Sequence, residues 1–241
     1  MMVRVDAAAV MRLGAATWLL AVLSGCASVQ RPDPLEAVNR KVFAFNEGMD
    51  RAVLAPLANA YEKTVPSPAR TAVRNFLANP GDLWSAANLV LQGKPGDAAS
   101  AVMRFAVNSV FGIAGLIDIA TPAGLPKSRE DLGQTLGVWG VANGAYIVWP
   151  FLGSSTLRDS VDIAADASLS ARAHVNDVRV RNQLTAVQAL SARADLLPVT
   201  RMLGDISLDR YVFVRDAYLQ RRLYLVYDGN PPEDTSSDLP E

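Results

Sequence analysis

Apolar residues recur at helical spacing in short segments of the chain, and proline or glycine separates most segments from the next. The first stripe of this kind comprises Leu35, Val38, Val42, Phe45 and Met49. It overlaps Asp33-Pro34-Leu35-Glu36, in which Asp33 is a candidate N-cap and Glu36 completes a capping box. Sustained alternation of apolar and polar residues, the pattern of half-buried strands, is rare. The chain is therefore predicted to be all-α, with short amphipathic helices.

Proline and glycine also place the later helices. Ser67-Pro68 opens a helix that Asn79-Pro80-Gly81 ends. Pro56 breaks or kinks another helix over residues 53–63, and Leu196-Leu197-Pro198 marks a turn. Further helices are predicted over residues 83–92, over 98–120 after Asp97 as cap, from Ser155 or Thr156 onward, over 177–194, and from about Asp209 to just before Gly229.

The most apolar helix candidate covers residues 98–120, where 16 of the 23 residues are apolar and Arg104 is one of only two charges. As a single bilayer-spanning helix it would bury Arg104 in lipid, which is costly. Gly112 and Gly115 are predicted to break it into two helices. Arg104 and Asn108 stand four residues apart and share a helix face. Two interpretations stay open: a central core helix, or a helix at the lipid interface.

The chain carries no charge between Asp131 and Arg158, and this stretch is rich in aromatic residues and glycine. A helix over the whole stretch would include five glycines, each costing about 1 kcal/mol relative to alanine. Two apolar runs, Leu136–Val141 and Tyr146–Phe151, flank Asn143-Gly144, a pair that suits a tight turn. An apolar hairpin or irregular loop is therefore predicted. The alternative is a loop buried in an ordinary core.

The N-terminal residues have the layout of a lipoprotein signal peptide. A basic residue, Arg12, precedes the apolar run Leu13–Leu23, and Leu23-Ser24-Gly25-Cys26 reads as a lipobox. Cys26 is predicted to carry a covalent lipid and, as the only cysteine, excludes an intrachain disulfide. The predicted divisions are a signal peptide at residues 1–25, a lipidated linker at 26–32, a helical domain at 33–227 and a disordered acidic tail at 228–241.

Charge and motif content exclude several function classes. The formal net charge of −1 at pH 7 argues against nucleic acid as a partner. His174 is the only histidine, and Gly153-Ser154-Ser155 is not a nucleophile elbow. Asp159, Asp162 and Asp166 are predicted to form a solvated helix face rather than a catalytic carboxylate pair. Without a phosphate loop or metal-ligand cluster, the chain is predicted to be no enzyme, with no metal and no cofactor besides the lipid.

Several segments, in this order and spacing, resemble the VacJ/MlaA lipoproteins of Gram-negative outer membranes. The segments are Asp33-Pro34-Leu35-Glu36, Asn39-Arg40, Leu91-Gln92-Gly93, Arg104-Phe105, Gly112–Asp118, Gly133–Val141, Pro150–Gly153, Leu157-Arg158-Asp159, and Tyr211-Val212 with Arg215, Ala217-Tyr218 and Gln220-Arg221. They cover almost the whole predicted domain. The family commonly has Gly-Pro-Tyr where this chain has Gly144-Ala145-Tyr146, which leaves the stiffness of that turn open.

The resemblance implies an all-helical ring in the periplasmic leaflet of the outer membrane. It also implies phospholipid as cargo, a trimeric outer-membrane porin as neighbour, and a soluble periplasmic lipid carrier that serves an inner-membrane ABC transport system. Such a protein removes mislocalised phospholipid from the outer leaflet and so maintains lipid asymmetry. The alternative is an envelope scaffold that binds porins without transporting lipid.

On this interpretation the uncharged stretch is the candidate lipid path or gate, because glycine permits movement and aromatic rings can contact acyl chains. The residues predicted for it are Leu136, Gly137, Val138, Trp139, Gly140, Val141, Gly144 and Tyr146. Arg104, Arg158 and Arg221 are candidate headgroup contacts, since guanidinium matches phosphate geometry. The alternative for each arginine is a structural ion pair or a surface position.

Overall fold

The computed structural model describes residues 33–203 and 209–232. The predicted signal peptide, the lipidation site at Cys26, the linker up to residue 32 and the part of the predicted tail from residue 233 lie outside the described residues. The tail was predicted to be disordered from residue 228, but Asp228 pairs with Lys94 at 2.6 Å. Within these residues helices dominate, and a two-stranded antiparallel sheet is the only sheet. The all-α prediction is confirmed.

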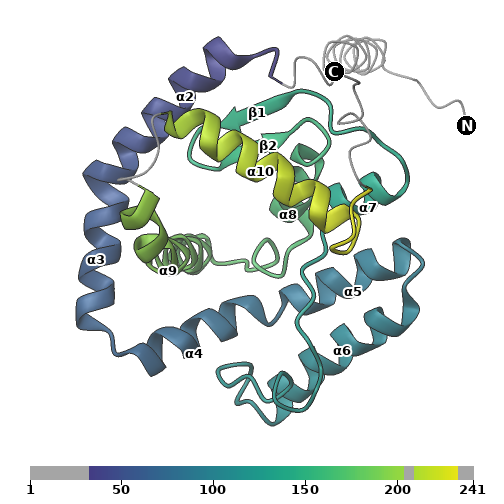
Figure 1. The fold of residues 1–241 in the computed structure, drawn as a ribbon. Coiled ribbons are helices and arrows are strands. Elements are labelled where there is room, and N and C mark those ends of the chain that lie inside the picture. The colour runs from purple at the N-terminus through teal and green to yellow at the C-terminus, as the bar shows by residue number, and fades with distance from the viewer. Residues whose placement is uncertain (1–32, 204–208, 233–241) are drawn as a thin grey trace, which may run out of the picture.

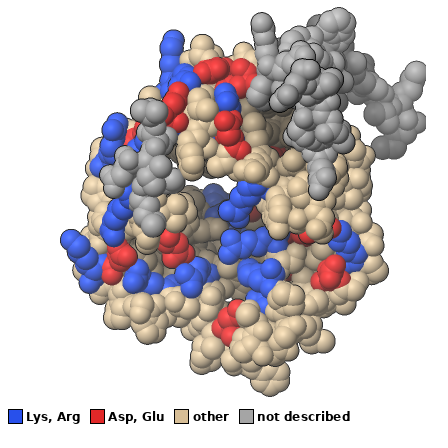
Figure 2. Space-filling model, in the orientation of Figure 1, with Lys and Arg blue, Asp and Glu red and all other residues tan. Residues whose placement is uncertain are grey.

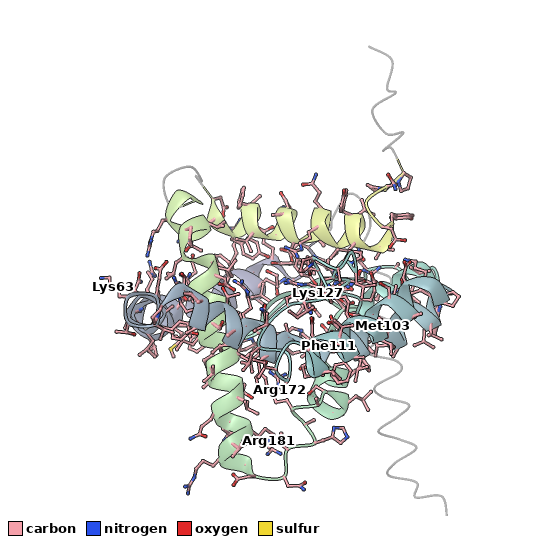
Figure 3. All side chains as sticks on the ribbon, turned by 90° about the horizontal axis from the view of Figure 1, so that it is seen from below. Lys63, Met103, Phe111, Lys127, Arg172 and Arg181 are labelled. Atoms are coloured by element: carbon pink, nitrogen blue, oxygen red, sulfur yellow. The ribbon has the colours of Figure 1, made fainter. Side chains whose placement is uncertain are left out.

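The elements up to α7 follow one another around a ring, and the later ones complete it (Figure 1). They are α2 (Glu36–Met49), the π-helical turn η1 (Asp50–Leu54), α3 (Ala55–Thr64), α4 (Ser67–Ala78), α5 (Gly81–Leu91), α6 (Pro95–Val110), α7 (Leu132–Val138), β1 (Tyr146–Trp149), β2 (Gly153–Thr156), α8 (Ser160–Leu169), α9 (Val178–Leu203) and α10 (Arg210–Val226). Seen edge-on, the ring is a flat disc (Figure 3). Helix α10 lies along one face, whereas α9 crosses the disc and projects from the other.

The polar side of α2 faces the inside of the ring. Asn39 is 2% exposed; its Nδ2 donates to the Tyr146 carbonyl and its Oδ1 accepts from the Val148 N–H, both at 2.9 Å. Asn46, two turns later on the same face, makes the same paired contact with the backbone at the end of β1, also at 2.9 Å. The two amides therefore satisfy backbone groups of the strand that would otherwise need water.

Part of the apolar stripe of α2 faces outward, whereas Val42 packs against the buried cluster of Tyr146, Val148 and Tyr211. Val38 is 60% exposed and Phe45 is 46% exposed. Other large apolar side chains exposed to a similar degree include Leu57, Val90, Val102, Met103, Val110, Phe111 and Ile113. None of the described helices combines the length and apolarity needed to cross a bilayer.

The interior is unusually polar. The largest fully buried side chains are Arg104, Tyr146, Gln134, Asn39, Asn88, Thr135, Thr156 and Asp82. The buried apolar clusters are small; one contains only Ala86, Leu89, Ala98 and Ala101. Apolar outside and polar inside is the reverse of the usual water-soluble domain.

The uncharged stretch folds as a helix, a loop and a hairpin. Helix α7 is the first of these elements along the chain, and it is helical although it contains two glycines. The predicted hairpin is present but displaced: β1 pairs with β2, so the chain reverses at residues 150–152 and not at Asn143-Gly144. Ser155 and Thr156 lie in β2, and the helix predicted to start there, α8, begins at Ser160. The error arose because strand pairing depends on partners that a local turn signal does not identify.

Helix α2 begins without the predicted capping box. The carboxylate of Asp33 instead accepts from Asn39 Nδ2 at 2.9 Å and from the Tyr211 hydroxyl. Asp33 therefore ties the start of α2 to α10, a tertiary contact that displaces the local cap.

Other helix starts and ends agree in part with those predicted from proline, glycine and capping residues. The starts predicted at Ser67 and after Asp209 are confirmed, and the Asp209 side chain caps α10. Helix α6 starts two residues before Asp97, and turns follow it instead of a second helix, with positive φ at residues 113–115. Helix α9 continues through Pro198, where a turn was predicted, and packs against α3. Tertiary packing overrode the proline there.

We predict that Asn39→Leu lowers the free energy of unfolding by about 2–4 kcal/mol, because it leaves two buried backbone groups of β1 without partners. Thermal or denaturant unfolding in detergent measures this. Asn176→Leu makes the same chemical change at an exposed position and is expected to stay within about 0.5 kcal/mol. Equal effects for the two variants would contradict the role assigned to Asn39.

Candidate functional site

A cavity of about 570 Å³ lies inside the ring, bounded by β2, α8, α9 and α10. Polar residues on its wall include Asp131, Asp159, Asp162, Asp166, Arg172, Arg181, Asn182, Thr185, Tyr218 and Arg222. Figure 2 shows this face of the molecule hollowed near its middle, with Lys and Arg side chains gathered beside the hollow. Side chains of both charges therefore meet in a compartment that an apolar ring encloses.

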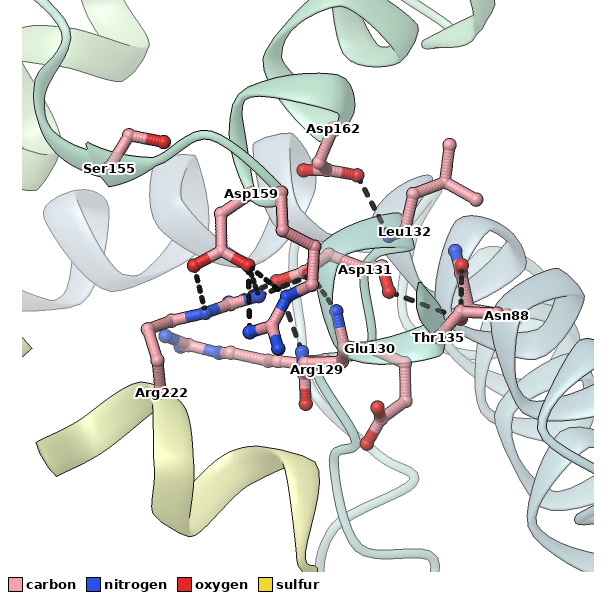
Figure 4. Close-up of polar contacts among 12 residues, drawn as sticks. Asn88, Arg129, Glu130, Asp131, Leu132, Thr135, Ser155, Asp159, Asp162 and Arg222 are labelled. Atoms are coloured by element: carbon pink, nitrogen blue, oxygen red, sulfur yellow. Dashed lines mark hydrogen bonds and ion pairs between the residues drawn. The ribbon is translucent and has the colours of Figure 1, made fainter. Parts of the chain in front are cut away.

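Arg222 of α10 joins three segments at one side of the cavity (Figure 4). Its guanidinium pairs with Asp131, the N-cap of α7, at 2.6 and 2.8 Å. It also pairs with Asp159, the residue before α8, at 3.0 Å. Tyr218, one turn earlier on α10, donates its hydroxyl to Asp159 at 2.9 Å. Because such charge-assisted bonds are strong when water is excluded, Arg222 fixes α7, α8 and α10 relative to one another.

The contacts around Asp131 and Asp162 shift the pKa values of these two carboxyl groups on the cavity wall. Burial raises the pKa of the Asp131 carboxyl, but the Arg222 guanidinium and hydrogen bonds from Gln134 together outweigh burial and hold that pKa below its usual value. At Asp162 burial prevails, and the pKa of that carboxyl is raised. The wall thus has a stably ionised carboxylate beside Arg222 and, at Asp162, a carboxyl that takes up a proton more readily.

The glycines of α7 allow close approach of charged side chains. A Cβ atom on Gly133 would lie 2.4 Å from Asp159 Oδ1 and 2.7 Å from Arg222 Nη2. A Cβ on Gly137 would lie 2.8 Å from Arg158 Nη1. Glycine costs helix stability, but only glycine leaves room for these side chains. Gly137, predicted as part of a lipid path, is therefore a packing residue beside Arg158.

None of the eight predicted path residues lines the cavity. Val138, Trp139 and Val141 expose 41%, 57% and 45% of their surface near the end of α7, so they remain candidates for lipid contact. Tyr146 is fully buried, and its ring packs edge-on against Tyr211 at 6.3 Å. The prediction that Tyr146 contacts acyl chains is wrong, because its side chain belongs to the core.

Of the remaining predicted path residues, two glycines have positive φ values and one leucine is partly buried. Gly140 and Gly144 have φ values of +87° and +67°, which a residue with a Cβ adopts only under strain. Leu136 is half-buried on α7. These glycines are needed for the shape of the loop, whatever movement it makes.

Arg104 is a structural ion pair and not a headgroup contact. Its side chain is 1% exposed, with Nε 3.6 Å from Asp82 and Nη2 3.3 Å from Asp118. Asn108, on the same helix face as predicted, also donates to Asp118. The core interpretation of α6 is therefore confirmed for this face, while its opposite face carries the exposed Val102 and Met103.

The other arginines are distributed differently from the prediction. Arg158 is 7% exposed and bonds to Asp159 at 3.0 Å, so it is buried and not available to a headgroup. Arg221 is exposed on α10 but does not line the cavity. Arg172 and Arg181 do line it, and the sequence reasoning missed both. Arg172 lies in an alanine-rich segment and Arg181 lies near Arg179, and no local pattern distinguishes either of them.

The usable sequence signal was the spacing of Asp159, Asp162 and Asp166, which places them on one side of α8. That side was predicted to be solvated. It faces the cavity instead, and Asp159 is only 5% exposed. Three carboxylates on one helix face are typical of a solvated surface, which is why this face was predicted to be exposed. Ring closure places Arg222, 63 residues from Asp159, against it, and the sequence spacing does not indicate that contact.

His174, the only histidine, does not line the cavity. His174 is exposed, and its Nδ1 lies 3.0 Å from the Ser170 carbonyl. Within residues 33–203 and 209–232, no three His, Cys, Asp or Glu side chains lie close enough together to hold a metal ion.

A sequence model of the family described as "MlaA lipoprotein" matches residues 31–225. The chain belongs to this family. It is 34% identical to the Escherichia coli K12 protein named "Intermembrane phospholipid transport system lipoprotein MlaA", over 91% of this chain and 90% of the relative. The Shigella flexneri protein of the same name is 35% identical over the same shares. The family predicted from the motifs is confirmed.

Structural comparison agrees. A solved structure described as "Structural basis for maintenance of bacterial outer membrane lipid asymmetry" matches with a TM-score of 0.73 and 35% identity. The match covers 81% of this chain and all of the other. Both named relatives are lipoproteins of a phospholipid transport system.

We predict that Arg222→Met lowers the free energy of unfolding by about 3–5 kcal/mol, because Asp131 and Asp159 lose their shared cation. Arg221→Met removes the neighbouring, exposed arginine of the same helix and is expected to cost less than about 0.5 kcal/mol. Denaturant unfolding of both variants in detergent checks this. If both variants unfold like the parent protein, Arg222 does not hold the three segments together.

Proposed function

We propose that this protein is an outer-membrane lipoprotein of an intermembrane phospholipid transport system. It takes mislocalised phospholipid from the outer leaflet through the ring and passes it to a soluble periplasmic carrier, which maintains lipid asymmetry. The observation that carries the proposal is the reversed polarity of the fold, a charged cavity within an apolar ring. The names of the relatives support the same function.

The apolar outside supports a position within a single leaflet. Side chains such as Val38, Phe45 and Phe111 are exposed at the surface, and burial of apolar surface in lipid is favourable by about 25 cal/mol per Å². Seen edge-on, the ring is flat, which is the shape expected of a protein that lies in one leaflet (Figure 3). The predicted acyl chains on Cys26 would hold the ring at the periplasmic leaflet.

The cavity wall suits a phospholipid headgroup. Arg172 and Arg181 provide guanidinium groups, which match phosphate oxygens in geometry and charge. Asp162 and Asp166 provide acceptors for the ammonium or hydroxyl groups of common headgroups. A headgroup can therefore exchange water for wall groups inside the ring while its acyl chains keep to apolar surface.

The proposed partners follow from this route. A trimeric porin can contact the apolar outside of the ring within the membrane, and a soluble carrier can receive lipid on the periplasmic side and deliver it to an ABC transport system. The lipid moves without change of its covalent bonds. The proposal therefore requires no catalytic residue, and no cofactor besides the lipid on Cys26.

We predict that Arg181→Glu lowers lipid removal roughly tenfold, because it replaces a phosphate-binding cation in the cavity by a repelling carboxylate. Arg179→Glu makes the same change on the same helix at an exposed residue that does not line the cavity. Labelling of outer-leaflet aminophospholipid on cells with a membrane-impermeant reagent measures the effect. A scaffold that transports nothing predicts equal labelling for the two variants at equal abundance.

A further inference from the structure

A second cavity of about 510 Å³ lies between α4, α5, α8 and α9, next to the central one. This volume is within the roughly 300–1,000 Å³ range of small-ligand sites. Its apolar wall is formed mainly by Phe76, Leu77, Leu83, Trp84, Leu169 and Leu184. We call it the side groove.

Large apolar side chains of the side groove are left uncovered. Phe76 is 43% exposed, Leu83 is 42% exposed and Leu169 is 57% exposed. These three residues come from α4, α5 and α8, so three elements turn apolar surface toward one hollow. Apolar side chains gathered in this way indicate a binding site for an apolar group.

Polar residues of the side groove gather at one boundary, and all of them except Gln188 and the Trp84 indole also line the central cavity. Asp166, Ser170 and Arg172 line both spaces. Arg172 pairs with Asp166 at 2.6 Å and donates to Gln188 on α9. The end of α8 and the connection to α9 therefore form a divider, with a charged cavity on one side and an apolar groove on the other.

Trp84 also links the two spaces. Its ring lines the side groove, while its Nε1 lies 3.3 Å from Asp162 Oδ1, on the wall of the central cavity. The polar edge of the indole thus points to the charged space and its body to the apolar one. A molecule placed across this boundary would need the same division, an apolar tail and a polar end.

We propose that the side groove holds one acyl chain of a phospholipid whose headgroup lies in the central cavity, with the phosphate beside Arg172. This inference rests on the proposed function and adds to it a tail site. A peptide segment fits less well, because its backbone amides would need partners along the groove, and the polar side chains there lie at the shared boundary. An acyl chain needs none.

The proposal predicts a dependence of affinity on chain length. Each methylene buried in the groove is worth roughly a fourfold gain in affinity. Binding of lysophosphatidylglycerols with octanoyl, decanoyl and dodecanoyl chains, below their micellar concentrations, is therefore expected to tighten stepwise toward that limit. Isothermal calorimetry with the full-length protein in a detergent of unlike headgroup measures this.

Leu184→Trp tests the groove itself, because the larger side chain fills it. We expect this variant to bind the octanoyl lipid as the parent protein does but to lose most of the gain from longer chains. Val187→Trp, on the same helix and outside both cavities, is the control and should keep the full gain. Equal slopes for the two variants would overturn the tail site, as would a parent protein whose affinity ignores chain length.

The failure of this proposal and that of the proposed function give different results. Arg181→Glu is expected to weaken binding of all three lipids by the same factor, since it acts on the headgroup. Headgroup binding without any chain-length dependence would leave transport standing and remove the tail site; no binding of any lipid would contradict both. A photo-crosslinking residue at position 184 identifies the occupant: lipid adducts support the tail site, and only protein adducts overturn it.

Discussion

Polar groups of this fold find their partners inside the protein wherever large apolar side chains form the outside of the ring, because those side chains offer no hydrogen bonds. Asn39 and Asn46 do for strand β1 what water does at the edge of a soluble sheet. Arg104 neutralises Asp82 and Asp118 where no solvent reaches it. Polar helix faces turn inward and apolar side chains turn outward because polar groups away from water need hydrogen-bond partners.

The same requirement produces a cavity that remains polar. Arg222 holds α7, α8 and α10 together through two aspartates, and the glycines of α7 give those charges room. The helices around the centre cannot collapse on it without burying charges such as Asp162 and Arg181. An open, charged centre beside an apolar groove is the division of space that the proposed passage of an amphiphile requires.

Local signals in the sequence predicted a substantial part of this fold. Ser67-Pro68 starts a helix because proline fits the first turn, and Asp209 caps α10 because its carboxylate can reach the free N–H groups. Arg104 and Asn108 share a face because they are four residues apart. These outcomes depend only on neighbouring residues, and the ordered motifs were enough to identify the family.

The tertiary structure alone decided which side of each element is buried and which charges meet. An apolar stripe packs equally well into a protein core or into lipid, so the spacing of Val38 and Phe45 could not indicate that they face outward. The glycines of α7 read as flexible until Arg222 and Asp159 were seen against them. The cavity arginines were missed for the same reason: closure of the ring places side chains from distant segments on one wall, and sequence spacing does not encode that distance.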